Sequence, residues 1–142
     1  LEPQLARAVP VCAVQPVSVA RLDAVVRDDV AFVKIDVEGH ELNVLNGAVG
    51  LIERSRPVFL VEAEDRHRAD ATSSVFGFFQ RRGYEGFFLD DGDVLAVDRF
   101  DAALFQDPAA LLPDGGRRKA SAYINNFFFF PPGTDGRAML GR

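Results

Sequence analysis

The chain has 142 residues, 48% of them apolar, which is enough for a single domain with a buried core. Its 16 Lys and Arg residues against 21 Asp and Glu residues give a net charge of −5, which argues against non-specific binding to nucleic acid or to anionic membranes. The one cysteine excludes an internal disulfide and cannot build a structural zinc site by itself. No apolar stretch approaches the roughly 20 residues of a membrane helix and no signal peptide is visible, so we expect a cytoplasmic protein.

The first half of the sequence predicts a βαβ unit. Val9–Val17 has the composition of a strand interrupted by two prolines, and Val19–Val26 predicts a short helix or turn. The runs Val30–Ile35 and Val58–Val61 are short, continuous and apolar, as strands covered on both faces of a parallel sheet are. Between them, Glu41–Arg54 has apolar residues at helical spacing. A strand, a helix and a strand over about 30 residues predict two parallel neighbouring strands joined by a helix.

The second half predicts further alternation of helices and strands. In chain order, the expected elements are a helix at Ser74–Arg82 stopped by Gly83, a hairpin of Tyr84–Leu89 and Val94–Val97, a short helix within Asp101–Leu112, a loop at Pro113–Arg118 and a final strand at Tyr123–Phe130. These elements favour an α/β fold whose sheet becomes antiparallel toward its C-terminal edge. We find no domain boundary.

Candidate chemistry gathers where the first predicted strand ends. In open α/β sheets ligands bind at the carboxyl ends of the strands, and this strand delivers Asp36, Glu38, His40 and Glu41 to that place. Glu62 ends the next strand, so it is expected near Asp36. Two carboxylates there could orient a substrate, bind a cation or accept a proton.

Structural interpretations compete with these functional ones. Glu38 and Glu41 suit the positive end of a helix dipole, and for Glu41 a capping or surface role has the same weight as a functional one. Glu62 could simply meet a neighbouring arginine. His40 and His67 do not form a pair with metal-ligand spacing, and we expect no metal site. No G-x-G pair occurs, so the sequence holds neither a dinucleotide fingerprint nor a Walker loop.

The segment FVKIDVEGHELNVLNGA, residues 32–48, resembles the signature of the FkbM family of methyltransferases, which use S-adenosylmethionine. The resemblance continues at Leu22-Asp23, at Arg56–Glu62 and at the late landmarks Gly83-Tyr84 and Asn126-Phe127. It implies the C-terminal half of a Rossmann-like methyltransferase sheet over residues 1–142, because the family's glycine-rich cofactor loop and the acidic residue after the second strand are absent.

The resemblance also implies roles for the residues at the strand ends. Asp36, Glu38 and Glu62 become candidate catalytic groups, Asp36 also faces the cofactor, and His40 and Glu41 bind substrate. Many family members methylate hydroxyls of sugars or secondary metabolites, so the expected reaction is an O-methyl transfer to such a small molecule.

Two other classes of function compete with this one. An inert or interaction-only methyltransferase remnant is compatible with the missing half. A phosphoacceptor signalling domain would use Asp36 but needs a lysine where the second strand has Glu62, which counts against it. We further expect weak or no binding of S-adenosylmethionine by this chain alone, and self-association through an exposed sheet edge.

Overall fold

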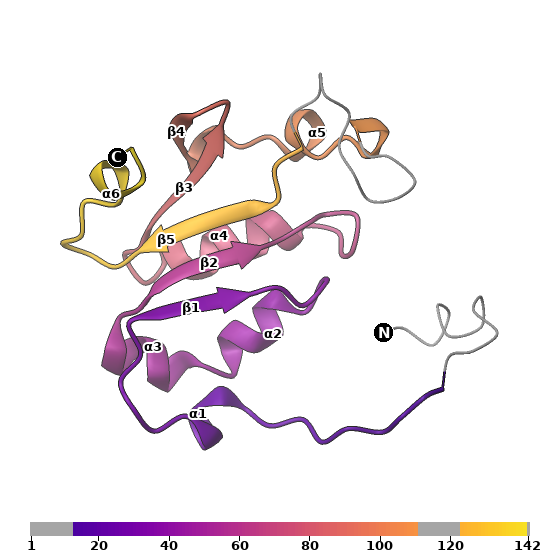
Figure 1. Ribbon diagram of the computed structural model, residues 1–142, viewed down its shortest axis with the longest axis vertical. Coiled ribbons are helices and arrows are strands. Elements are labelled where there is room, and N and C mark those ends of the chain that lie inside the picture. The colour runs from indigo at the N-terminus through magenta and orange to yellow at the C-terminus, as the bar shows by residue number, and fades with distance from the viewer. Residues whose placement is uncertain (1–12, 111–122, 142) are drawn as a thin grey trace.

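The computed structural model describes residues 13–110 and 123–141 and shows a mixed α/β fold (Figure 1). Its strands are β1 Phe32–Ile35, β2 Val58–Glu62, β3 Glu85–Asp90, β4 Asp93–Ala96 and β5 Asn126–Phe130. Its α-helices are α1 Leu22–Val25, α2 Glu41–Asn46, α3 Val49–Ser55, α4 Ala71–Gln80, α5 Ala102–Phe105 and α6 Gly136–Leu140, and the 3₁₀ helices are Val97–Arg99 and Pro108–Ala110.

The five strands form one sheet in the order β1-β2-β5-β3-β4. β1 and β2 are parallel neighbours, which confirms the predicted βαβ pairing, and β3 and β4 form the predicted antiparallel hairpin. β5 pairs antiparallel with both β2 and β3. The last strand of the chain therefore lies inside the sheet and not at its edge, and β1 and β4 are the two edge strands.

The helix predicted over Glu41–Arg54 is instead two helices, α2 and α3, separated at Gly47 and Ala48. The break has a physical cause in the segment before β1. The Asp23 carboxylate accepts hydrogen bonds from the Leu51 and Gly50 amides at 2.9 and 3.2 Å, in the first turn of α3. A side chain from outside the helix thus supplies the cap that starts α3, and the Asp23 amide also donates to the Gly47 carbonyl at 2.9 Å.

Several predicted boundaries also change. Residues 13–20 form no strand, and the predicted Val9–Val17 strand otherwise lies outside the described residues, as does the predicted loop at 113–118. The short helix expected in Val19–Val26 is α1. The helix expected within Asp101–Leu112 is α5 followed by one 3₁₀ turn. β5 begins at Asn126 and not at Tyr123, and before it the Ile124 amide donates to the Phe105 carbonyl at 2.8 Å and not to a neighbouring strand.

The core lies between one face of the sheet and the helices α2, α3 and α4. In Figure 1 α2 and α3 lie beside β1, and α4 passes behind β2 and β5. Phe79 of α4 stacks on Phe129 of β5 with ring centroids 4.0 Å apart, and Phe59 of β2 meets Phe79 at 4.9 Å. Tyr84 is part of this core, and burial raises the pKa of its hydroxyl to about 12.

The opposite face of the sheet is more open. Phe32 on the edge strand β1 is 52% exposed, and Leu60 and Phe128, which pair across β2 and β5 on the same face, are only partly buried. Among the described residues no helix is long and apolar enough to cross a membrane.

Candidate functional site

The candidate site lies where β1 and β2 end and β5 begins. Because β5 runs antiparallel to β2, its first residues lie beside the carboxyl end of β2, where Glu62 pairs with Asn126. A small cavity of about 10 Å³ opens there, room for about one water molecule. Its lining is almost entirely acidic and consists of Asp36, Glu38, Glu41, Glu62, Glu64 and His67.

Asp36 and Glu62 lie together at this edge, as expected for the ends of neighbouring parallel strands. Asp36 is exposed and forms an ion pair with Lys34, whose Nζ lies 3.1 Å from Asp36 Oδ2. Glu62 is half-buried, and its burial raises its pKa above the ordinary value. The negative charges of Asp36 and Glu64 raise the pKa further, and Lys34 opposes them. Glu62 is therefore the carboxylate at this edge with an increased affinity for a proton.

The loop between β1 and α2 is held by its own residues. Glu38 and Gly39 both have positive φ, 47° and 97°, and a Cβ on Gly39 would lie 3.3 Å from His67 Cβ, so the chain passes too close for most side chains. The Gly39 amide donates to Glu41 Oε1 at 2.7 Å. Glu41 is buried, at 2% exposure, so its side chain lies within the fold at the start of α2 and fixes the loop. Glu38 stays exposed at the mouth of the cavity.

His40 and His67 line two different hollows. His40 is exposed at the start of α2, where its Nδ1 lies 3.2 Å from Asn43 Nδ2. It lines a different hollow, of about 630 Å³, between α2 and residues 19–22. His67 is exposed and contributes to the acidic cavity, although the sequence had favoured His40 over it.

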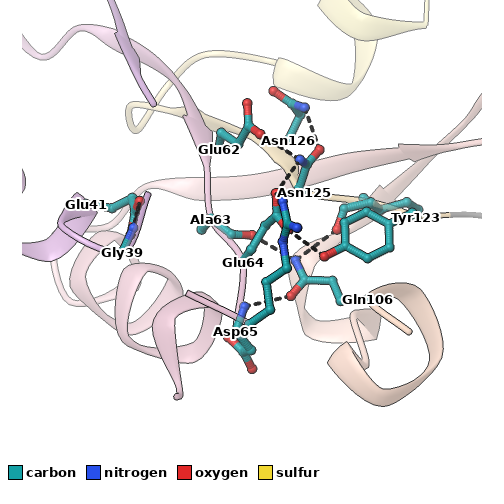
Figure 2. Close-up of polar contacts among 12 residues, drawn as sticks. Gly39, Glu41, Glu62, Ala63, Glu64, Asp65, Gln106, Tyr123, Asn125 and Asn126 are labelled. Carbon is teal, nitrogen blue, oxygen red and sulfur yellow. Dashed lines mark hydrogen bonds and ion pairs between the residues drawn. The ribbon is translucent and has the colours of Figure 1, made fainter. Parts of the chain in front are cut away.

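Sequence reasoning missed a polar network that lies behind Glu62 (Figure 2). Glu64 is 3% exposed and accepts hydrogen bonds from three side chains. Its partners are the Tyr123 hydroxyl at 2.5 Å, Asn125 Nδ2 at 2.9 Å and the Arg66 guanidinium. Burial alone would raise the pKa of Glu64, but the hydrogen bonds from these three residues lower it overall, so Glu64 is a buried carboxylate that stays ionised.

Asn125 joins this buried anion to Glu62. Its Nδ2 donates to Glu62 Oε1 at 2.7 Å as well as to Glu64, and its Oδ1 accepts from Asn126 Nδ2 at 2.8 Å. The alternation of acidic residues in Glu62-Ala63-Glu64 and the Asn125-Asn126 pair were the available signals, since polar residues at the ends of apolar strands need partners. These two segments lie side by side only because β5 runs antiparallel to β2 in the sheet.

Gln106 ties a further segment to the same edge. Its amide nitrogen donates to the Ala63 and Ile124 carbonyls at 2.8 and 3.0 Å, and its amide oxygen accepts from the Asp65 amide at 2.9 Å. Every polar atom of this buried side chain thus bonds to backbone on either side of the network. Gln106, which follows α5, thereby fixes the end of β2 relative to the residues that lead into β5.

Metal chemistry has no ready ligand set in this region. Within residues 13–110 and 123–141 no group of three or more His, Cys, Asp or Glu side chains is arranged to hold a metal ion. Four of the five acidic side chains of the cavity are instead engaged with protein partners, Asp36 with Lys34, Glu41 with Gly39, and Glu62 and Glu64 with Asn125. The arrangement supports proton transfer and hydrogen bonding.

Comparison with known proteins identifies a family for part of the chain. Residues 13–85 match the family model described as the methyltransferase FkbM domain, which is more than half of the chain. The matched range contains Asp36, Glu38, Glu62 and Glu64, and it ends before Tyr123 and Asn125. No curated protein and no solved structure matches the chain.

Proposed function

Because the chain belongs to the FkbM methyltransferase family, we propose that it forms part of an S-adenosylmethionine-dependent methyltransferase acting on a hydroxyl of a sugar or secondary metabolite. The observation that carries the proposal is the position of Asp36 and Glu62 at the carboxyl ends of two adjacent parallel strands, inside the range that matches the family. Ligand sites in open α/β sheets lie at that edge.

The residues of this chain would act on the methyl acceptor. An acceptor hydroxyl must lose its proton, and Glu62 combines a raised pKa with a place at the cavity. Asp36, exposed beside it, would orient the hydroxyl, and Glu38 and His40 lie exposed around the same loop, where they could contact the rest of a polar substrate. Glu41 would contribute to substrate binding through the loop that it holds, since its side chain is buried.

The acidic cavity by itself is too small for the cofactor. The acidic cavity has a volume of about 10 Å³, whereas a ligand of the size of S-adenosylmethionine needs a pocket on the order of hundreds of Å³. Asp36 is the residue best placed to face the cofactor, because it follows the edge strand β1. We therefore propose that most of the cofactor site is built by protein beyond the open side of β1.

The sheet itself supports the same proposal. A Rossmann-like sheet has helices on both faces. Here α2, α3 and α4 pack on one face, whereas on the other face α6 lies against Phe130 and Phe32 on β1 remains exposed. We infer that β1 to β5 form the C-terminal half of such a sheet within a single methyltransferase domain. The open edge of β1 would pair with the remaining strands, or with a second copy of the chain when these are absent.

The alternative of an inert remnant draws on one observation, the small volume of the cavity. Calorimetric titration of the purified chain with S-adenosylmethionine, together with its mass by light scattering, tests the incomplete cofactor site. We expect weak or no binding and a mass above that of a monomer, whereas tight stoichiometric binding by a stable monomer would contradict the incomplete site. Methyl transfer by a protein that contains this chain would exclude the inert remnant.

The catalytic proposal is tested by Asp36→Asn in a protein that contains this chain and has methyl-transfer activity. We expect turnover to fall by about 10²- to 10⁴-fold while the circular dichroism spectrum is unchanged, because the exchange keeps the side-chain shape and removes the charge. Glu53→Gln is the matched control, since Glu53 is an exposed carboxylate on α3 away from the cavity. Full turnover in the Asp36 variant would remove Asp36 from the mechanism.

A further inference from the structure

We propose that Asn125 is a positioning residue, which holds the Glu62 carboxylate in one orientation at the mouth of the acidic cavity so that Glu62 can take a proton from a bound hydroxyl. The proton transfer in this proposal rests on the proposed function, whereas the positioning of Glu62 rests on the hydrogen-bond geometry. Asn125 lies outside the range that matches the family model, so nothing in that match assigns it a role.

The orientation of the Asn125 amide is determined by its partners. Its NH₂ group has two hydrogens, and the two carboxylates at 2.7 and 2.9 Å take one each. Its oxygen accepts from Asn126 Nδ2 at 2.8 Å. Flipping the amide would place an oxygen against both Glu62 and Glu64 and an NH₂ group against the Asn126 donor. Only the observed orientation of the Asn125 amide satisfies Glu62, Glu64 and Asn126 together.

The anchor of this arrangement is Glu64. It is almost fully buried, and Tyr123 and Arg66 hold its carboxylate from other directions. The backbone of Asn125 is also fixed, because its carbonyl accepts from the Ala63 amide at 2.8 Å. Glu62 is the more exposed of the two carboxylates, so it is the one whose orientation depends on Asn125.

The hydrogen bond from Asn125 also assigns the two oxygens of Glu62. Oε1 already accepts from Asn125, and we therefore assign the proton transfer to Oε2. In that step the O–H bond of the acceptor breaks, an O–H bond forms at Glu62 Oε2, and the electron pair stays on the acceptor oxygen. Lys34 and Asp36 are the other charged groups that act on Glu62 from β1, and both would be unaltered by a change at Asn125.

The experiment measures the protonation of Glu62 directly. The side-chain carboxyl carbon of Glu62 is followed by NMR as a function of pH in the 142-residue chain, with no cofactor or acceptor added. A donor to the charged form lowers a carboxyl pKa, so Asn125→Ala should raise that of Glu62 by about one pH unit. Asn125→Asp should raise it more, because it adds a negative charge. Asn46→Ala, which removes an exposed asparagine on α2, should leave it unchanged.

A second variant keeps the test decisive if changes at Asn125 prevent folding. Asn126→Ala removes the donor to Asn125 Oδ1 and leaves Asn125 in place, and we expect a smaller upward shift in the same titration. An unchanged Glu62 titration in the variants that fold would overturn the positioning role. The outcome is separate from the test of the proposed function, because full turnover in Asp36→Asn would remove Asp36 from the mechanism and would leave the effect of Asn125 on Glu62 to be decided by this titration.

Discussion

Replacing Glu64 with glutamine tests whether the buried network is stabilised by a charge. In the native protein each Glu64 oxygen accepts from two donors, Oε2 from Tyr123 and Arg66 and Oε1 from Asn125 and Arg66. The amide of Glu64→Gln offers one oxygen and one NH₂ group. The Tyr123 hydroxyl can rotate to accept from that NH₂ group, whereas the Asn125 amide is fixed, so the new oxygen is expected to face Asn125.

The expected loss in the free energy of unfolding follows from the hydrogen bonds that survive in Glu64→Gln. Two hydrogen bonds survive, to Tyr123 and Asn125, but each changes from a bond to a charged group, about 1.5–3 kcal/mol, to a neutral one, about 0.5–1.5 kcal/mol. The Arg66 side chain is 46% exposed and can return to water. The expected loss is therefore about 2 kcal/mol in the free energy of unfolding.

Urea unfolding at neutral pH measures this loss, with Glu53→Gln as the control that removes an exposed carboxylate. The pH dependence gives a second check. The pKa of folded Glu64 lies below the ordinary 4.5, so its stabilisation is fully present above that value and is lost as the pH falls through the folded pKa. The free energies of unfolding of the native protein and of Glu64→Gln should therefore converge at acidic pH. If Glu64→Gln were as stable as Glu53→Gln at neutral pH, the charge would play no part in holding this edge together.

Gly86→Ala should lower the free energy of unfolding by about 1–3 kcal/mol, because its Cβ would lie 2.7 Å from Phe129 Cε1 in the packed core. Gly77→Ala in α4 should instead raise the free energy of unfolding by about 0.5–1 kcal/mol, since the nearest atom, 3.0 Å away, is the flexible end of an arginine. Equal effects of Gly86→Ala and Gly77→Ala in urea unfolding would refute this packing argument. Asp23→Ala should destabilise the protein at neutral pH and much less in acid. The hydrogen bond from the Leu51 amide is the main cause that lowers the pKa of Asp23 below 3.8, so its stabilisation is lost as the pH falls through the folded value. Thermal unfolding at pH 7 and pH 3 checks this, and a pH-independent difference would rule out the cap.

The parts of the fold that follow from local pattern could be predicted. The β1 and β2 strands are short apolar runs on either side of a helical segment, and that pattern alone predicts their parallel pairing. The position of Asp36 and Glu62 at one edge follows from it. The break between α2 and α3 could not be predicted in this way, because its cause is Asp23, which reaches α3 from a segment more than 25 residues earlier in the chain.

The part of the candidate site that contains Tyr123 and Asn125 depends on the position and direction of β5, which the local sequence pattern does not determine. The Phe127–Phe130 run indicates a buried strand, but nothing in it tells whether the strand lies at the edge or inside the sheet, or which way it runs. Its antiparallel insertion between β2 and β3 brings the start of the strand to the functional edge. Asn125 and Tyr123 therefore meet Glu62 and Glu64 about 60 residues away in sequence.

The same insertion has a consequence for how the chain folds. β1 with β2, and β3 with β4, can each form from nearby sequence, but within the sheet these two units are joined by β5, which comes last in sequence among the described strands. Until β5 arrives, β2 and β3 each present an unpaired edge, with apolar side chains beside it. We expect closure of the sheet to be the slow, long-range step of folding, since its pairs join residues about 40 to 70 positions apart in the sequence. A nascent chain that ends before residue 126 would be a pair of open half-sheets, the state most exposed to aggregation.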